Sequence, residues 1–259
     1  MKYPLFVTPL LCLSLLAFPL NARELDPIET DRPDYTESAT TVPKGYWQFE
    51  NGYTFGKDGD TTVHTLGEAL IRLGLNDGLE ARFGLNSYHI ESDTTTSTQG
   101  LEDIFVGIKW QWLSQNSNIP GQPDLSVMLH CFLPTGAESF RSQTLRPQAK
   151  LAASWDLNDR WSLGTNQNFT LLYDGSTSFW QYSPSCVLGY SWTDQLSSYT
   201  ELYGFFPTDT TGGQTHYFNA GLAYQFSPDF QVDTRIGLGL NGKPNDYFVG
   251  IGSGIRFGH

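Results

Sequence analysis

The sequence carries few positive charges. Its 259 residues include 15 Lys and Arg against 27 Asp and Glu, a formal net charge of −12. A nucleic-acid partner would require clustered Lys and Arg to hold its phosphate backbone, and the sequence has no such cluster. Charged residues reach only 16%, below the roughly 25% of ordinary soluble domains, whereas aromatic residues reach 14%. We therefore expect no nucleic-acid partner, and the composition is unlike that of a cytosolic enzyme.

Long hydrophobic runs are absent after the N-terminal region. The run from Leu5 to Leu20 follows Lys2 and precedes the small residue Ala22, which is the layout of a secretory signal peptide. We place this signal peptide at residues 1–22. Because a membrane helix needs ~18 consecutive apolar residues, the rest of the chain excludes a helical membrane protein.

Cysteine is scarce. Cys12 lies in the signal peptide, so the mature chain keeps Cys131 and Cys186. A pair in an oxidising compartment could form a disulfide. The strand pattern described below puts both on an outward face and on strands that are not neighbours, so we expect two separate thiols.

One local pattern recurs along the chain: a polar tight turn between apolar residues, as in Leu-Asn-Asp-Gly-Leu ending at Leu79. Its third turn position falls at Asp77, Asp159, Asp194 and Pro228, separated by 82, 35 and 34 residues. The first gap is two periods if residues 114–122 form a longer turn of the same kind. A period near 35 that covers two strands, a short turn and a longer loop predicts a hairpin repeat.

Alternation of apolar and polar residues outward from these turns predicts about twelve strands, with ten to fourteen possible. Between Phe230 and Asn241, one face holds apolar residues and the other holds Gln, Asp, Arg, Gly and Asn. The predicted strands are residues 45–55, 62–75, 78–89, 101–113, 124–134, 144–157, 160–173, 179–192, 195–206, 214–226, 230–241 and 246–257.

Alternation alone does not say which face points inward. Three further features favour a barrel with its apolar face toward lipid. Glycines crowd the polar side, as expected in a narrow lumen; aromatic residues gather where strands meet the short turns; and the final strand ends on Phe257. The glycines are Gly237, Gly239, Gly250, Gly252 and Gly254, and the tryptophans are Trp47, Trp110, Trp112, Trp155, Trp161 and Trp192. The predicted fold class is an all-β, transmembrane, antiparallel up-and-down β-barrel over residues 45–259; the alternative is a secreted soluble β-sandwich or lipocalin-like barrel.

Several segments resemble one bacterial family. They are T-D-R-P-D-Y-T-E-S (Thr30 to Ser38), residues 41–45, W-Q-F-E-N-G-Y-T-F (Trp47 to Phe55), residues 103–110, residues 154–157 and residues 247–252. Together they resemble the outer-membrane β-barrel transporters named for meta-pathway phenol degradation. The resemblance implies passage of aromatic or other small compounds, and it supplies no catalytic residues.

Charged residues of both signs fall on the predicted lumen face. They could line a passage that selects solutes, or they could form ion pairs that fill the barrel; both interpretations stay open. The pattern places Glu68, Arg72, Glu80 and Arg82 on facing sides of one hairpin, which favours pairing there. The candidates are Glu50, Glu68, Arg72, Glu80, Arg82, Asp103, Lys109, Arg146, Lys150, Asp156, Glu201, Asp233, Arg235, Asp246 and Arg256.

Residues 23–44 form an acidic N-terminal segment that precedes the first strand. Its motif contains Asp31, Arg32, Asp34 and Glu37. The segment could fold into the barrel as a periplasmic plug, with Arg32 pairing a lumen carboxylate. The alternative, which the charge pattern favours, is a solvated tail or a structural lid.

The sequence offers no catalytic or metal-binding constellation. Its five histidines lack the close spacing of a metal site, so we expect no metal and no cofactor. Twelve-stranded outer-membrane phospholipases carry a Ser and a His two residues apart on an outward face. Here His216, on the predicted outward face, is followed at that spacing by Phe218. We therefore expect no enzyme.

The combined prediction is a monomeric outer-membrane channel for small solutes, with aromatic or hydrophobic compounds as the candidate solutes. The alternative function is a closed barrel with a structural or lipid-organising role. The expected partners are outer-membrane lipids, the barrel assembly machinery and the small-molecule solute.

Overall fold

The computed structural model describes residues 25–85, 87–116, 118–209, 213–241 and 246–258. The expected signal peptide and its cleavage after Ala22 lie outside these residues. The described chain forms β1 (Tyr46–Asp58), β2 (Thr61–Asn76), β3 (Leu79–Gly84), β4 (Tyr88–Ser92), β5 (Ser97–Leu101), β6 (Phe105–Leu113), β7 (Asp124–Phe132), β8 (Arg146–Asp156), β9 (Trp161–Tyr173), β10 (Ser178–Ser191), β11 (Leu196–Pro207), β12 (Thr215–Ser227), β13 (Phe230–Gly239) and β14 (Tyr247–Gly258). No helix among the described residues is long and apolar enough to cross a membrane.

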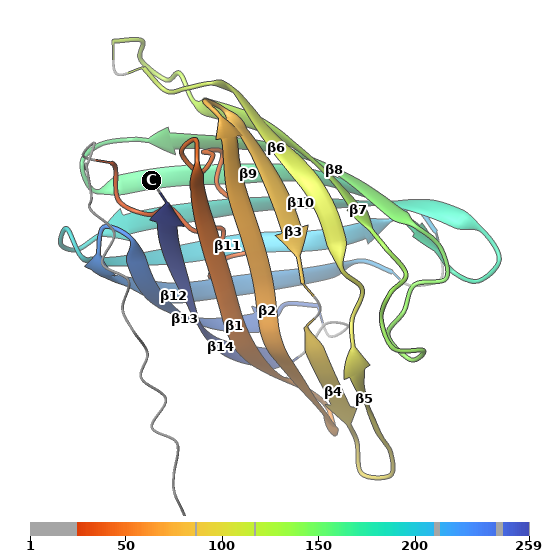
Figure 1. The fold of residues 1–259 in the computed structure, drawn as a ribbon. Helices are drawn as coiled ribbons and strands as arrows, with labels where there is room; N and C mark the ends of the chain where they lie inside the picture. Colours follow the sequence, from red (N-terminus) through yellow and green to blue (C-terminus); the bar gives the residue numbers. More distant parts are fainter. Residues whose placement is uncertain (1–24, 86, 117, 210–212, 242–245, 259) are drawn as a thin grey trace, which may run out of the picture.

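These strands close into an antiparallel barrel (Figure 1). β1 pairs with β14 on one side and with β2 on the other, so the described sheet has no free edge at its first strand. β3 and β4 both pair with β2. On their other sides, β3 pairs with β6 and β4 pairs with β5. β3 with β4, and β5 with β6, therefore each occupy one position in a ring of twelve, as predicted.

Two of the strands were predicted to be continuous, and this prediction is wrong because each is interrupted. The expected strand 78–89 is interrupted between β3 and β4, and 101–113 is replaced by β5 and β6. The interruption lies opposite an irregularity in β2, where Gly67 and Glu68 have φ of 101° and 32° and the β1–β2 register shifts. An extra residue of this kind bends a strand and breaks its ladder.

The short turns found in the sequence join neighbouring strands at one end of the barrel. Asp77, Asp159, Asp194 and Pro228 lie between β2 and β3, β8 and β9, β10 and β11, and β12 and β13. We call this the turn end and the opposite end the loop end. In outer-membrane barrels short turns face the periplasm and longer loops face outside.

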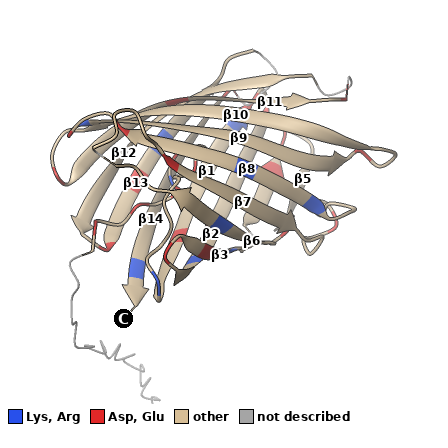
Figure 2. Ribbon diagram, turned by 90° about the horizontal axis from the view of Figure 1, so that it is seen from above, with Lys and Arg blue, Asp and Glu red and all other residues tan. Residues whose placement is uncertain are grey.

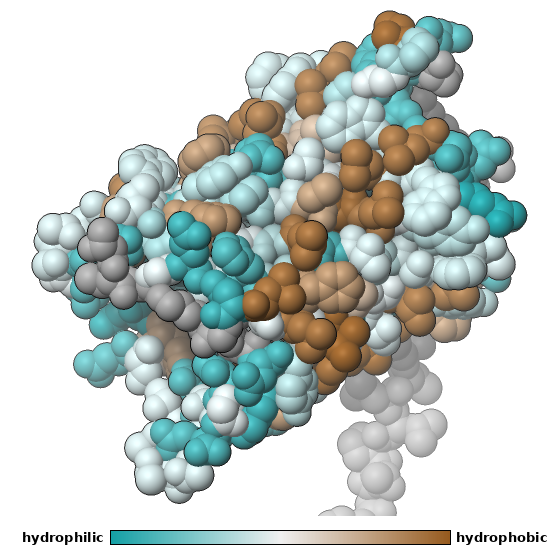
Figure 3. Space-filling model, turned by 180° about the vertical axis from the view of Figure 1, so that it is seen from behind, coloured by the Kyte–Doolittle hydropathy of each residue, from teal (hydrophilic) through white to brown (hydrophobic). Residues whose placement is uncertain are grey.

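The outward face is apolar, which identifies the barrel as the transmembrane kind. Side chains such as Leu129, Leu202 and Ile251 are each 50% or more exposed. Hydrophobic residues gather across the middle of the face in Figure 3, with hydrophilic ones toward its margins. Five of the six predicted turn-end tryptophans are among the exposed side chains, with Trp155 half-buried. Cys131 on β7 and Cys186 on β10 are free thiols, as expected.

Residues 25–44 lie inside the barrel (Figure 1). They begin at the turn end, where the Ile28 amide donates to the Pro228 carbonyl (2.7 Å), and return to it where Lys44 bridges Gly74. Ala39 and Val42 are buried at 0% and 3% exposure. The solvated-tail alternative is therefore wrong for these residues: the segment fits the lumen, because glycine and small polar side chains line the wall around it.

Candidate functional site

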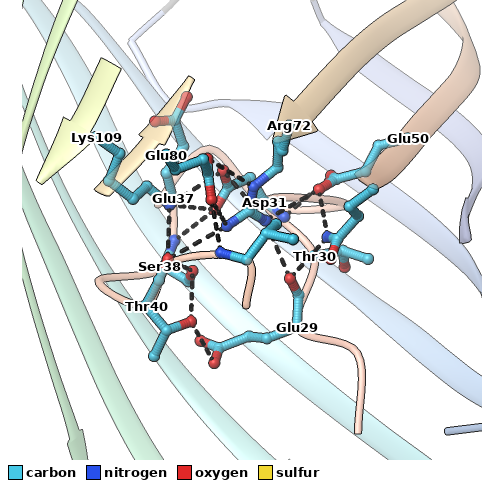
Figure 4. A network of polar contacts seen from close by, with 12 residues as sticks. Glu29, Thr30, Asp31, Glu37, Ser38, Thr40, Glu50, Arg72, Glu80 and Lys109 are labelled. Atoms are coloured by element: carbon cyan, nitrogen blue, oxygen red, sulfur yellow. Dashed lines mark hydrogen bonds and ion pairs between the residues drawn. The ribbon is translucent and has the colours of Figure 1, made fainter. Parts of the chain in front are cut away.

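A buried ion-pair cluster joins the N-terminal segment to one side of the barrel wall (Figure 4). Asp31 comes from the segment, and its partners come from β1, β2, β3 and β6. We call this set the Asp31 cluster: Asp31, Glu50, Arg72, Glu80, Arg82 and Lys109. The five wall residues are at most 1% exposed and Asp31 is 7% exposed. In Figure 2 the charged positions of β2, β3 and β6 fall close together.

Asp31 is the segment's carboxylate that contacts all three cations of this cluster. It lies 2.7 Å from Arg82 Nη1, 3.2 Å from Lys109 Nζ and 3.5 Å from Arg72 Nη1. Its Oδ1 also accepts the Ser38 amide, and its own amide donates to Glu50 Oε2. Burial alone would raise the pKa of Asp31, but the three cations outweigh it and hold the pKa well below its ordinary value.

Arg72 links the remaining wall residues. Its guanidinium donates to Glu80 Oε1 (2.9 Å) and Oε2 (3.0 Å), and to Glu50 Oε1 (3.1 Å). It also donates to the carbonyls of Glu29 and Thr40 in the segment. Three cations and three carboxylates therefore neutralise one another, which a buried cluster requires. The predicted pairing across the β2–β3 hairpin is present for Arg72, Glu80 and Arg82.

Glu68 belongs to a different cluster. Its carboxylate accepts from Arg32 of the segment (2.7 Å) and from Arg235 of β13 (2.9 Å). Arg32 also lies 3.5 Å from Asp233, so the expected pairing of Arg32 with a lumen carboxylate is present. Grouping Glu68 with the hairpin cluster was wrong, because the irregularity in β2 re-aims its side chain.

Two facing glycines make room for Arg32. Gly52 on β1 and Gly252 on β14 are register partners, and a Cβ built on either would overlap the Arg32 guanidinium. A Cβ on Gly254 would lie 2.5 Å from Thr30 Cγ2. The glycine-rich face of the last strand, noted in the sequence, is thus the surface on which the segment packs.

We expect Gly252→Val to displace Arg32 and loosen the segment. Overpacking of this kind costs about 1–3 kcal/mol, and the displaced Arg32 would leave Asp233 without this ion pair. Limited proteolysis within residues 25–44 should become faster. Ser253→Val, next in the chain and on the other face of β14, serves as the control; equal protease resistance in both variants would contradict the assignment.

Glu201 binds the tip of the segment without a cation. Its carboxylate accepts the Tyr35 amide (2.9 Å), the Thr36 amide (2.6 Å) and the Thr36 hydroxyl (2.6 Å). The Thr36 hydroxyl also contacts Ser185 Oγ at 2.8 Å. The Tyr35 ring stacks on Tyr203, with centroids 4.6 Å apart. The alternation pattern placed Glu201 on the lumen face, but nothing in it singled out Tyr35 and Thr36, although both lie in the T-D-R-P-D-Y-T-E-S motif.

Glu37 pairs with Lys150 of β8 at 2.8 Å and lies 3.5 Å from Arg82. Burial alone would raise the pKa of Glu37, but Lys150 and Arg82 lower it from 4.5 to about 2. A pKa lowered by folding contributes stability that is complete above the unfolded value and is lost as the pH falls through the folded value.

The docked segment should therefore withstand mild acid. We expect ion conductance in planar bilayers to be equal at pH 7 and about pH 5, and to rise only between about pH 4 and pH 2, as Glu37 and Asp31 take up protons. A rise that is complete by about pH 5 would contradict this assignment and point to groups with higher pKa.

The other predicted site residues lie away from these contacts. Asp103 accepts three backbone amides from residues 133–145 and pairs with Arg146 at 3.5 Å, so both hold a loop-end segment rather than line an open passage. Arg256 binds Asp229 and the Asp26 carbonyl at the turn end. Asp246 is exposed and accepts the Gly59 amide, which corrects its placement in the lumen. Asp34 and Asp156 line the cavity described next.

A cavity of about 380 Å³ lies between the segment and a wall formed mainly by β8 to β11, with Asp124 of β7, Ala223 of β12 and Gln231 of β13. It is on the opposite arc of the barrel from β1, β2, β3 and β6. Its lining includes Thr36 and Ser38 of the segment and Ser162, Gly164 and Ser197 of the wall. The described residues bring together no group of three His, Cys, Asp or Glu side chains suited to a metal ion.

Known proteins match the chain at the levels of family and fold. A family model described as "Putative MetA-pathway of phenol degradation" matches residues 30–257. No curated protein matches. An outer membrane channel from Pseudomonas putida F1 is 14% identical, with a TM-score of 0.67, covering 88% of this chain and 100% of that one. The KdgM porin in complex with disordered oligogalacturonate is 11% identical, with a TM-score of 0.54, covering 82% and 99%.

Proposed function

The chain belongs to the family described as "Putative MetA-pathway of phenol degradation", and from this membership and its fold we propose that it is an outer-membrane channel for small solutes. Export by an N-terminal signal peptide, assembly in the outer membrane and a monomeric state are parts of this proposal. The similar folds of an outer membrane channel and a porin support it. We further propose that residues 25–44 close the lumen at rest.

The Asp31 cluster carries the plug proposal. Arg72, Arg82 and Lys109 outnumber Glu50 and Glu80 on the wall, and Asp31 of the segment supplies the missing negative charge. A segment held by ion pairs and hydrogen bonds is separable from the wall in water, because its contact groups can be hydrated when they part. Filling by apolar side chains would favour permanent closure instead.

The wall behind the segment is polar. Asn166, Asn168, Ser183 and Ser185 are buried on β9 and β10. Displacing the segment would expose these amides and hydroxyls to water, and a polar interior is what water-filled barrels have. This feature favours a channel over the alternative of a closed barrel with a structural or lipid-organising role.

The solute class that we propose is small aromatic compounds. The family description refers to phenol degradation. Toward the loop end, Tyr203 stacks on Tyr217 (centroids 4.9 Å apart, planes at 9°), and Phe205 and Phe248 lie beside Tyr217. Ring faces of this kind bind planar rings by stacking. We propose no catalytic role for any residue.

A reversible tether tests the plug. Thr36 Oγ1 and Ser185 Oγ are 2.8 Å apart, so Thr36→Cys with Ser185→Cys should form a disulfide between the segment and β10. Cys131 and Cys186 are first replaced by Ser. We expect discrete conductance steps in planar bilayers after reduction and none after oxidation.

Two other outcomes would decide between the alternatives. Equal conductance in the oxidised and reduced protein would overturn the plug while keeping the channel. No conductance in the reduced protein, nor in a variant that lacks residues 25–38, would favour the closed structural barrel. The Thr36→Cys single variant, treated with the same reagents, controls for the loss of the Thr36 hydroxyl.

A further inference from the structure

Small side chains form part of the cavity wall beside the segment, together with larger ones such as Val187 and Tyr199. The small residues on β8 to β11 are Ser154, Ser162, Gly164, Gly189 and Ser197. A Cβ on Gly164 would lie 2.9 Å from Val187 and 3.4 Å from Thr36. The space therefore follows from the size of these residues, and it is present while the segment is docked.

Carboxylates outnumber cations on this cavity, and of these carboxylates Glu37 is paired with Lys150 of β8. Five carboxylates line it, and they are Glu29, Asp34, Glu37, Asp124 and Asp156. Arg32 also lines it, but its guanidinium is bound to Glu68 and Asp233. None of the described lining residues is a Lys. The cations of the Asp31 cluster lie on β2, β3 and β6, and Arg82 among them lies 3.5 Å from Glu37.

Toward the loop end the cavity stops at Thr36. Thr36 lines it and is held by Glu201 and Ser185. Tyr35, one residue earlier, packs against the wall on Tyr203, which in turn stacks on Tyr217. Three hydrogen bonds to Glu201 and one ring stack thus separate the cavity from the aromatic part of the lumen.

We propose that this cavity is the turn-end half of the conduction path, that Tyr35 and Thr36 are its gate, and that its carboxylates make the path prefer cations. The proposal rests on the channel function proposed above and specifies the route. Opening it requires only the tip to move, while the Asp31 cluster stays intact. The competing route runs through the volume of the Asp31 cluster, after the whole segment has left.

Tyr35→Ala tests the gate. This change removes the ring that stacks on Tyr203 and leaves every side chain of the Asp31 cluster in place. We expect conductance steps in planar bilayers, with a reversal potential in a tenfold KCl gradient that shows K⁺ to be about twofold or more as permeant as Cl⁻. Asp156→Asn, at the exposed mouth of the cavity, should lower that ratio.

Cysteine labelling tests the route. In Tyr35→Ala with Cys131 and Cys186 replaced by Ser, Ser197→Cys places a thiol in the cavity and Gln111→Cys places one on β6, near the turn end on the other arc. A positively charged methanethiosulfonate added from the turn-end side should reduce conductance by about twofold or more for Ser197→Cys, and leave Gln111→Cys unchanged. The reverse pattern would overturn the proposed route.

Failure of this inference can be told from failure of the channel function. If Tyr35→Ala does not conduct but the reduced tether variant does, the gate proposal is wrong and the channel remains. Conductance with equal K⁺ and Cl⁻ permeability would overturn the cation preference. If no variant conducts, including the one without residues 25–38, the channel function itself fails.

Discussion

Replacing Asp31 by Ala should open the barrel without unfolding it. The segment would then lose the three ion pairs of Asp31 with Arg72, Arg82 and Lys109, and the bond to the Ser38 amide. Removing one partner from a buried charged set costs about 3–5 kcal/mol. Because the barrel strands keep all their hydrogen bonds, this cost should appear as release of the segment.

The measurement is channel activity together with protease sensitivity. We expect Asp31→Ala to show conductance steps far more often than the unchanged protein, and chymotrypsin to cut after Tyr35. Glu29→Ala removes the same charge from the same segment, but its carboxylate contacts only the Thr40 hydroxyl among the hydrogen bonds described. An identical response in the two variants would mean that net charge, and not the Asp31 cluster, holds the segment.

Arg72→Ala should have the largest effect on stability. Its guanidinium makes five hydrogen bonds, three of them to Glu50 and Glu80, and is 1% exposed. Without it two carboxylates remain buried side by side, and we expect a loss of about 3–5 kcal/mol in the free energy of unfolding. This loss is measured from the urea concentration at which half of the protein is unfolded, with the folded and unfolded forms distinguished by their gel mobility.

Arg146→Ala is the matched control for that experiment. Arg146 is also an arginine on the lumen face, but its side chain is 32% exposed and lies 3.5 Å from its partner Asp103, so the change should cost less than about 1 kcal/mol. Arg72→Ala with lower stability and unaltered conductance would remove Arg72 from any role in selecting solutes. A midpoint equal to that of Arg146→Ala would contradict the buried cluster.

The strand pattern was predictable because alternation is a local property. Each side chain in a strand points away from its neighbours in sequence, so the faces of β13 and β14 followed directly from residues 230–257. The turn residues Asp77, Asp159 and Asp194 fixed where strands end. The prediction of two continuous strands at residues 78–89 and 101–113 failed. The irregularity at Gly67 and Glu68, opposite the interruption between β3 and β4, has the same alternation of residues as a continuous strand, so the sequence pattern does not reveal it.

The partners of the lumen charges were not predictable from one sequence. Asp31 is 51 residues from Arg82 and 78 from Lys109 along the chain, and Thr36 is 165 from Glu201. Alternation places each wall residue on the inner face but says nothing of what occupies the lumen. The acidic character of residues 23–44 suggested a hydrated tail, because its charge balance could be judged only after the cations opposite it were known.

The position of the Arg32 pocket determines the order in which the barrel closes and the segment docks. Gly52 and Gly252 belong to the first and last strands, and they lie opposite each other where β1 and β14 join. The pocket that receives the guanidinium forms only when β1 and β14 have paired with each other. The N-terminal segment therefore completes its docking only after β14 has paired with β1. Arg32 bound in this pocket indicates that the barrel has closed.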